Sequence, residues 1–155
     1  IKIFRKNRFL YMIRSPMIHT YYYLNEKIGY GEMDIPLSIT TEEAKKLIPK
    51  HYEKFIVEFL AEILGGNIEK TLRDEIDGII TRKKKILAVI EVKTGSIGVK
   101  DVEIFVRKTK DLGIRAPRIV VSSNKVNHSK VISLDINDIM RLATNPKIIQ
   151  ELELS

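Results

Sequence analysis

The chain has 155 residues, of which 44% are hydrophobic and 30% are charged, a composition that is typical of a globular protein and argues against a fibrous or disordered one. It has 27 Lys and Arg against 20 Asp and Glu, and the resulting formal net charge of +7 favours polyanionic partners. No apolar run approaches the length of about 18 residues that a membrane span needs, and cysteine is absent, so we expect a cytoplasmic protein without a membrane partner.

The first forty residues show no regular apolar pattern, and we interpret residues 1–40 as a basic N-terminal extension and linker ahead of a domain at 41–155. Within it the pattern predicts a strand at 9–13, a short helix from Ser15 to Leu24, and a loop at 25–40. The first fourteen residues carry five positive charges and no negative one, which fits either a solvated edge or an arm that contacts phosphates. These charges are Lys2, Arg5, Lys6, Arg8 and Arg14.

The domain at 41–155 alternates between helix and strand patterns. Thr40 or Thr41, followed by two glutamates, predicts a helix N-terminus, and Pro49 separates this helix from the next. The apolar spacing further predicts helices at 50–64, 99–112, 135–143 and 145–154, and strands at 67–73, 75–82, 86–93, 118–122 and 130–134. This order predicts an α/β fold with an αβββαβ core, in which helices flank a central mixed sheet.

Two carboxylates and one lysine fall near the ends of neighbouring predicted strands. Side chains alternate faces along a strand, so Glu91 and Lys93 point the same way. A three-residue turn at 83–85 would place Asp77 across from Glu91. A two-residue turn would shift the register by one residue and put the carboxylates on opposite faces, so we predict the odd-length connection.

A third carboxylate comes from the helix at 50–64. Glu53 lies about 80° from the centre of the apolar face of this helix, nearer than Glu58 or Glu62. It can therefore reach a site at the edge of the buried face.

This set of side chains suits a site for a hydrated divalent cation that acts on a phosphodiester. Mg²⁺ (or Mn²⁺) takes hard oxygen ligands, and we predict that Asp77, Glu91 and the Val92 carbonyl supply them. Glu53 would bind a second ion or a metal-bound water, and Lys93 would orient the attacking water or stabilise the charge that develops on phosphorus. The alternative is a surface salt bridge of Lys93 with Glu91 or Asp77, because E-x-K triplets are common in a chain rich in Lys and Glu.

These residues resemble the PD-(D/E)xK, or restriction-endonuclease-like, superfamily of nucleases. Its pattern matches Glu53 on the first helix of the core, Asp77 on the second strand, and Glu91-Val92-Lys93 on the third. Ile76 stands where the family usually has proline, which leaves the proposed metal ligand in place. The resemblance covers about residues 50–122 and implies a metal-dependent endonuclease that hydrolyses phosphodiester bonds in DNA, with branched or junction DNA among its substrates. It also implies that Glu53, Asp77, Glu91 and Lys93 are catalytic.

Two groups within this superfamily are similar to the chain. The stretch from Tyr52-Glu53 to the segment 99–113 is similar to archaeal Holliday junction resolvases, which are dimers and use a serine or glutamate after the lysine. Ser96 is the candidate for that serine, and a homodimer is one assembly that this similarity implies. The candidate DNA contacts are then Ser96 and Lys100, together with Lys2, Arg5, Lys6 and Arg8 of the basic extension.

The second similar group is the C-terminal nuclease-like domain of archaeal AAA-type ATPases. Residues 9–16 and His51-Tyr52-Glu53 resemble the segments that lead into that domain. The roughly fifty residues ahead of the core and the absence of an initial methionine favour this group, which implies an ATPase domain on the same full-length chain. No G-x-x-x-x-G-K-[ST] loop is present, so nucleotide hydrolysis would lie outside these residues. The alternative function is a noncatalytic DNA- or protein-binding C-terminal module of a larger archaeal ATPase.

Overall fold

The structure is a computed structural model that describes residues 1–6, 12–71 and 76–146, and these fall into two compact units. The larger unit comprises residues 1–10 and 53–155, and the smaller comprises residues 11–52. The division that we expected at residue 40 stays a prediction. No helix in the described part of the chain has both the length and the apolar character that crossing a membrane requires.

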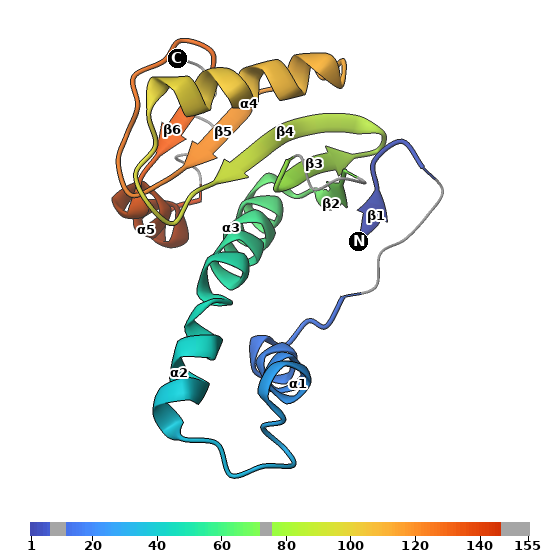
Figure 1. Cartoon of the computed structure of the whole chain (residues 1–155). Helices are drawn as coiled ribbons and strands as arrows, with labels where there is room; N and C mark the ends of the chain where they lie inside the picture. The colour runs from blue at the N-terminus through green and yellow to red at the C-terminus, as the bar shows by residue number, and fades with distance from the viewer. Residues whose placement is uncertain (7–11, 72–75, 147–155) are drawn as a thin grey trace. The chain divides into compact units, whose positions relative to one another are not determined.

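The larger unit is built on a six-stranded mixed sheet whose strands lie side by side in chain order (Figure 1). The strands are β1 (Lys2–Ile3), β2 (Asn67–Lys70), β3 (Gly78–Arg82), β4 (Lys85–Val92), β5 (Arg118–Val121) and β6 (Ile132–Leu134). The strands β2, β3 and β4 pair antiparallel, whereas β1, β5 and β6 join the sheet in parallel. The α/β class and the mixed sheet that the sequence predicts are confirmed.

Helices cover both faces of this sheet, as the sequence predicts (Figure 1). The helix α3 (Ile48–Leu64) packs on one face, where a Cβ added to Gly78 of β3 would lie 2.5 Å from Val57 Cγ1. The helix α4 (Val99–Asp111) packs on the other face, in a buried cluster that joins it to β3, β4 and β5: Val102, Phe105 and Val106 with Ile79, Val89 and Val120. Burial of these apolar side chains on both faces is the main stabilising contribution to this unit.

The turn between β3 and β4 is shorter than predicted. It consists of Lys83 and Lys84 alone, at φ 48° and 69°, which is the backbone of a primed two-residue hairpin turn. The predicted three-residue turn is therefore wrong. The carboxylates nevertheless share a face, because Leu87 is an extra residue in β4: Thr81 pairs with Ile86 but Ile80 pairs with Ala88, and beyond this bulge Gly78 pairs with Ile90. One step further along, Asp77 lies across from Glu91.

Several element ends also differ from the sequence prediction. The strand β2 ends at Lys70 and β3 begins only at Gly78, while residues 72–75 lie outside the described part. The strand expected at 9–13 falls partly on residues 7–11, which are not described, and Met12 and Ile13 belong to no strand. The final helix expected at 145–154 falls on residues that are not described from 147 onward.

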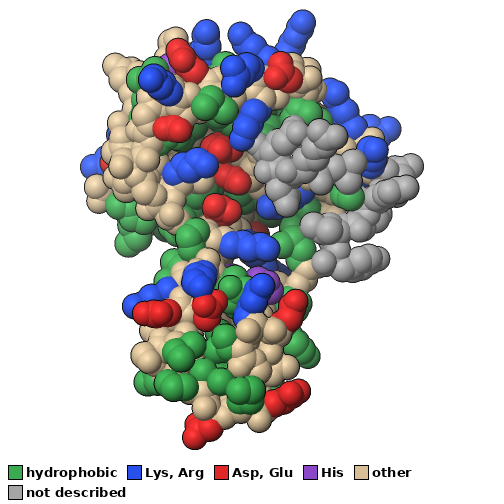
Figure 2. Space-filling model, in the orientation of Figure 1, with side chains coloured by type: hydrophobic (Ala, Val, Ile, Leu, Met, Phe, Trp, Pro, Cys, Tyr) green, Lys and Arg blue, Asp and Glu red, His purple; other side chains and the backbone are tan. Residues whose placement is uncertain are grey.

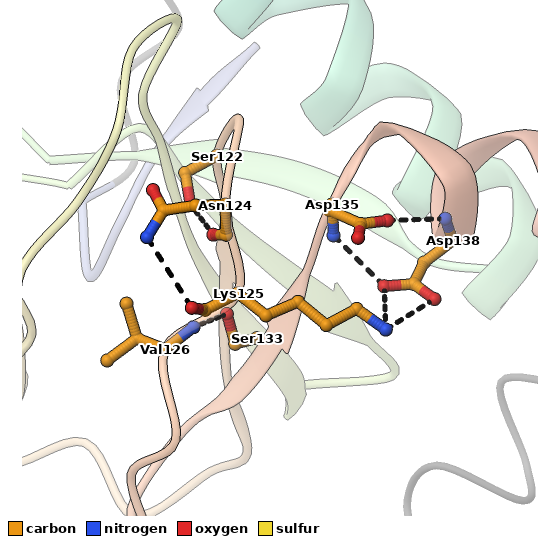
Figure 3. A network of polar contacts seen from close by, with 7 residues as sticks. All are labelled: Ser122, Asn124, Lys125, Val126, Ser133, Asp135 and Asp138. Atoms are coloured by element: carbon orange, nitrogen blue, oxygen red, sulfur yellow. Dashed lines mark hydrogen bonds and ion pairs between the residues drawn. The ribbon is translucent and has the colours of Figure 1, made fainter.

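The predicted cap at Asp135 is confirmed, and it begins α5 (Ile136–Thr144). Asp135 Oδ1 accepts a hydrogen bond from the Asp138 backbone N–H at 3.0 Å, and Asp138 Oδ2 accepts one from the Asp135 N–H at 3.0 Å (Figure 3). Lys125, from the loop after β5, donates to Asp138 Oδ1 at 2.9 Å. Burial opposes ionisation of Asp138, but the hydrogen bonds with Lys125 and Asp135 and the charge of Lys125 together outweigh it and lower the pKa of this carboxyl. The network ties the loop to the start of α5.

The smaller unit contains α1 (Pro16–Ile28), α2 (Leu37–Lys45) and the first turn of α3. Ser15 caps α1 by accepting from the Ile18 N–H at 3.4 Å, as the Ser-Pro pair predicts. The predicted start of α2 at Thr40 or Thr41 is wrong, because both hydroxyls donate to carbonyls four residues earlier inside the helix and neither acts as a cap.

Candidate functional site

The candidate site lies where β4 ends and β3 begins. Glu91 and Lys93 alternate with Val92, and Glu91 shares the face of Val89, which packs against α4. Asp77 directly precedes β3, so the register carried on from the Gly78–Ile90 pair puts it across from Glu91, whose pKa its charge raises. The bulge in β4 therefore brings together three of the four side chains that the sequence predicts to be catalytic.

Glu91 is buried to an unusual degree for a carboxylate, with 7% of its surface exposed. Burial raises the pKa of Glu91, and the neighbouring charge of Asp77 raises it further, whereas Lys108 and Lys93 oppose these effects. The structure thus holds an acid in a place where a second negative charge is close and water is largely excluded. A bound cation would relieve both penalties.

Lys93 is the cation closest to this acid, with its Nζ 3.4 Å from Glu91 Oε1. Burial acts to lower the pKa of Lys93, but the charge of Glu91, with smaller contributions from Asp77 and Glu53, outweighs it and raises the pKa. The side chain of Lys93 is 49% exposed, so solvent screens the pair and it contributes about 1 kcal/mol or less to stability. Lys93 is therefore a fixed positive charge at the surface of the site.

Asp77 has a structural contact in addition to its place in the site. Its Oδ2 accepts a hydrogen bond from the Val92 backbone N–H at 2.7 Å. The next residue, Lys93, donates its N–H to the Val121 carbonyl on the opposite side of β4 at 2.8 Å. Because a strand residue presents its N–H and C=O to the same side, the Val92 carbonyl is directed toward the Asp77 side of β4. The predicted ligands Asp77, Glu91 and the Val92 carbonyl thus lie around one end of the strand.

Glu53 acts on the site through its charge, which raises the pKa of Lys93 together with the charges of Glu91 and Asp77. It lies on α3, which packs on the face of the sheet opposite to that of Asp77 and Glu91, and its recorded effect at the site is on the charge of Lys93. Within residues 1–6, 12–71 and 76–146, no three His, Asp or Glu side chains gather closely enough to hold a metal ion. The oxygen groups near one another are the carboxylates of Asp77 and Glu91, which interact electrostatically, and the Val92 carbonyl on the Asp77 side of β4.

The predicted DNA contacts are distributed over two regions. Ser96, in the loop after β4, and Lys100, in the first turn of α4, are exposed on the chain segment that leads away from the site. Lys2 of β1 pairs with Glu69 at 3.7 Å, Lys6 is exposed, and the Arg5 guanidinium lies 5.0 Å from the centre of the Phe4 ring. The strand β1 is three strands away from β4, about 14 Å at the usual spacing. The position of Arg8 lies outside the described residues.

Lys108 is a charged residue near the site that the sequence reasoning missed. It lies on α4, and its charge lowers the pKa of Glu91, against the effect of burial. The available signal was its position three residues after Phe105 and one before Thr109, both buried, which places Lys108 at the border of the apolar stripe. In Figure 2, Lys and Arg side chains with some Asp and Glu among them line the top of the molecule, where Figure 1 places α4.

Comparison of the chain with protein-family models, with curated proteins and with solved structures found no match.

Proposed function

We propose that this chain is a metal-dependent endonuclease of the PD-(D/E)xK type that hydrolyses phosphodiester bonds in DNA, with branched or junction DNA among its substrates. The observation that carries the proposal is the placement of buried Glu91 beside Asp77 on one face of the sheet, with Lys93 next to it. The αβββαβ order of α3, β2, β3, β4, α4 and β5 supports it, because the resemblance implies that order.

The donor set fits Mg²⁺ or Mn²⁺, which prefer hard oxygen ligands and keep several waters. Glu91, the Val92 carbonyl and the Asp77 oxygen that does not bind the Val92 N–H would hold the ion. When bound, the ion would lower the pKa of a coordinated water and neutralise charge on the phosphoryl oxygens.

The protein's own contribution is positioning and charge. Lys93 presents an ammonium group that Glu91 holds in place, and it can stabilise the extra negative charge of the pentavalent phosphorus. Hydrolysis forms a bond between phosphorus and the water oxygen and breaks the bond to one ester oxygen, which leaves as an alcohol after it takes up a proton. Glu53, whose charge also raises the pKa of Lys93, would help to keep the ammonium charged.

A noncatalytic DNA- or protein-binding module of a larger archaeal ATPase is the second candidate. It is favoured by two structural contacts that occupy the same side chains: Asp77 bonds the Val92 N–H, and Lys93 pairs with Glu91. In that case the acidic pair would bind a cation without turnover, or would only support the end of β4.

Cleavage assays on linear and branched DNA with Mg²⁺ or Mn²⁺ test the proposal. Asp77→Asn keeps an oxygen for the Val92 N–H but removes the charge, so the fold should persist while cleavage falls at least about 100-fold. Lys93→Met should have a comparable effect. Glu69→Gln is the matched control, because Glu69 is a half-buried strand carboxylate that pairs with a lysine away from the site, and it should cleave normally.

Wild-type protein that binds DNA but cleaves none of these substrates with either metal would establish the noncatalytic module instead. Cleavage that survives Asp77→Asn and Lys93→Met would show that hydrolysis occurs elsewhere.

A further inference from the structure

A cleft of about 550 Å³ opens at the end of the β3–β4 hairpin, the end opposite to Asp77 and Glu91. Three segments of the larger unit form it: the C-terminus of α3, the start of β4 with Arg82 of β3, and the loop before β5. Its volume is in the range of ligand-binding clefts. The residues that line it are Ile63, Leu64, Gly65, Arg82, Lys85, Ile86, Leu87, Arg115, Ala116 and Pro117.

Three cations line this cleft, and no described acidic residue pairs with them. Among the described residues that line it none is acidic, and Arg82, Lys85 and Arg115 make no recorded hydrogen bond or ion pair with the described part of the chain. Lys83 and Lys84 of the adjoining turn are exposed. Figure 2 shows Lys and Arg side chains at the right of the upper part, on the side where Figure 1 draws this hairpin turn. The described lining of the cleft therefore carries three positive charges and no negative one.

Ordinary structural roles account for only part of this charge. Arg82 lies near the C-terminus of α3: its Nη1 would be 3.5 Å from a Cβ added to Gly65, the residue after the helix. A positive charge is favourable at the C-terminus of a helix. Lysines at a hairpin turn also discourage association between strand edges. Neither role explains why Arg115, from the loop before β5, converges on the same cleft as Lys85.

Apolar side chains line the cleft beside these three cations, which are themselves exposed. Long basic side chains bury their stems on apolar surface and keep their charged ends in water. This arrangement presents guanidinium and ammonium groups at the rim, where they match the geometry of phosphate oxygens.

We propose that this cleft binds backbone phosphates of the DNA substrate, an inference that rests on the proposed function. Asp77 and Arg82 are five positions apart in the sequence, which corresponds to about 17 Å along an extended strand. Successive phosphates of one DNA strand advance about 3.4 Å along the duplex axis, so the two places are about five base pairs apart. The cleft is thus a second contact that holds the DNA while the acidic end acts on it.

Fluorescence anisotropy with labelled duplex DNA in EDTA measures this contact without cleavage. The triple variant Arg82→Gln, Lys85→Gln, Arg115→Gln is compared with the control Lys27→Gln, Lys45→Gln, Lys50→Gln, which removes the same net charge from exposed positions of the smaller unit. Three lost phosphate contacts should reduce the slope of log affinity against log salt by up to about 2.7, and affinity should fall about 10- to 100-fold. The control should keep the wild-type slope.

Equal affinity and slope for the two triple variants would overturn the inference, as would wild-type protein that binds no DNA. A normal thermal unfolding transition of the cleft variant establishes that its loss of binding is not a loss of fold. Failure of the proposed function has a different signature: DNA binding that depends on the cleft, with no cleavage by wild-type protein.

Discussion

Replacement of Glu91 by glutamine should stabilise the metal-free protein while it removes a predicted metal ligand. Glu91 and Asp77 face each other across adjacent strands, and for charges about 6 Å apart at an effective dielectric constant of about 20 the repulsion is about 3 kcal/mol. Lys93, 3.4 Å from Glu91 Oε1 but half exposed, offsets about 1 kcal/mol or less. A net gain of about 2 kcal/mol should raise Tm by about 4–8 °C.

The gain should depend on pH in a defined direction. The folded protein raises the pKa of Glu91 above its value of 4.5 in the unfolded chain. At a pH between these two pKa values, the native state binds more protons at Glu91 than the unfolded state does. The stabilisation from this proton is therefore complete at a pH below the pKa of the unfolded chain, and it is lost as pH rises through the pKa of the folded protein. Glutamine stays neutral throughout. The variant should therefore exceed wild type at pH 7 and approach it at about pH 4.

Thermal unfolding followed by circular dichroism in EDTA at both pH values measures this effect, and a Mn²⁺ titration completes it. The ion should raise Tm of wild type and leave that of Glu91→Gln almost unchanged, because only the former has the full ligand set. Glu69→Gln serves as control, since the recorded partners of Glu69 are Lys2 and Thr81 and no gain is expected. A lower Tm for Glu91→Gln at pH 7, or equal Mn²⁺ shifts in both proteins, would refute the reasoning.

Three further changes test the fold, each by denaturant unfolding. Gly78→Ala places a Cβ 2.5 Å from Val57 Cγ1 and should lower the free energy of unfolding by about 1–3 kcal/mol. Adding Val57→Ala to this variant should recover part of that loss. If the destabilisations of the two single variants simply add in the double variant, the close contact is contradicted. Lys84 has a left-handed backbone with φ 69°, which glycine adopts without strain, so Lys84→Gly should raise the free energy of unfolding by about 1 kcal/mol at an unchanged m-value. An unchanged free energy of unfolding would mean that the turn is not strained. Asp138→Asn removes a carboxylate whose pKa is lowered in part by the hydrogen bond from Lys125. The variant should be about 1 kcal/mol less stable to unfolding than wild type at pH 7, and the two proteins should be equally stable at about pH 2. A difference in stability that is the same at both pH values would mean that the loss comes from the helix cap alone.

The helices and their ends follow from short-range physics that the sequence carries directly. The 3.6-residue apolar repeat predicted α3 and α4 to within two residues at each end. The left-handed glycines Gly65 and Gly113 follow these two helices, where the sequence placed their ends. The cap at Asp135 was also predictable, because a carboxylate that accepts from a nearby N–H needs only local geometry.

The candidate site shows where such reasoning stops. That Asp77 and Glu91 share a face was predicted correctly but from a wrong turn, because the register depends on the bulge at Leu87. Nothing in the residue pattern marks that bulge, since it depends on how two strands and the helices on their faces pack together. For the same reason the sequence predicted that Glu53 lies at the edge of the buried face of α3. It did not reveal that α3 packs on the face of the sheet opposite to that of Asp77 and Glu91.

The sequence by itself determined most helices and strands of the larger unit, which residues are apolar enough to be buried, and that acids and a lysine stand at neighbouring strand ends. Those properties depend on residues within one or two turns of each other. Only the tertiary structure decided the register of β3 against β4, the side of the sheet that each helix covers, the approach of Lys108 to Glu91, and the convergence of Arg82, Lys85 and Arg115. These relations join residues far apart in the chain, and their free energies depend on packing that no local pattern contains.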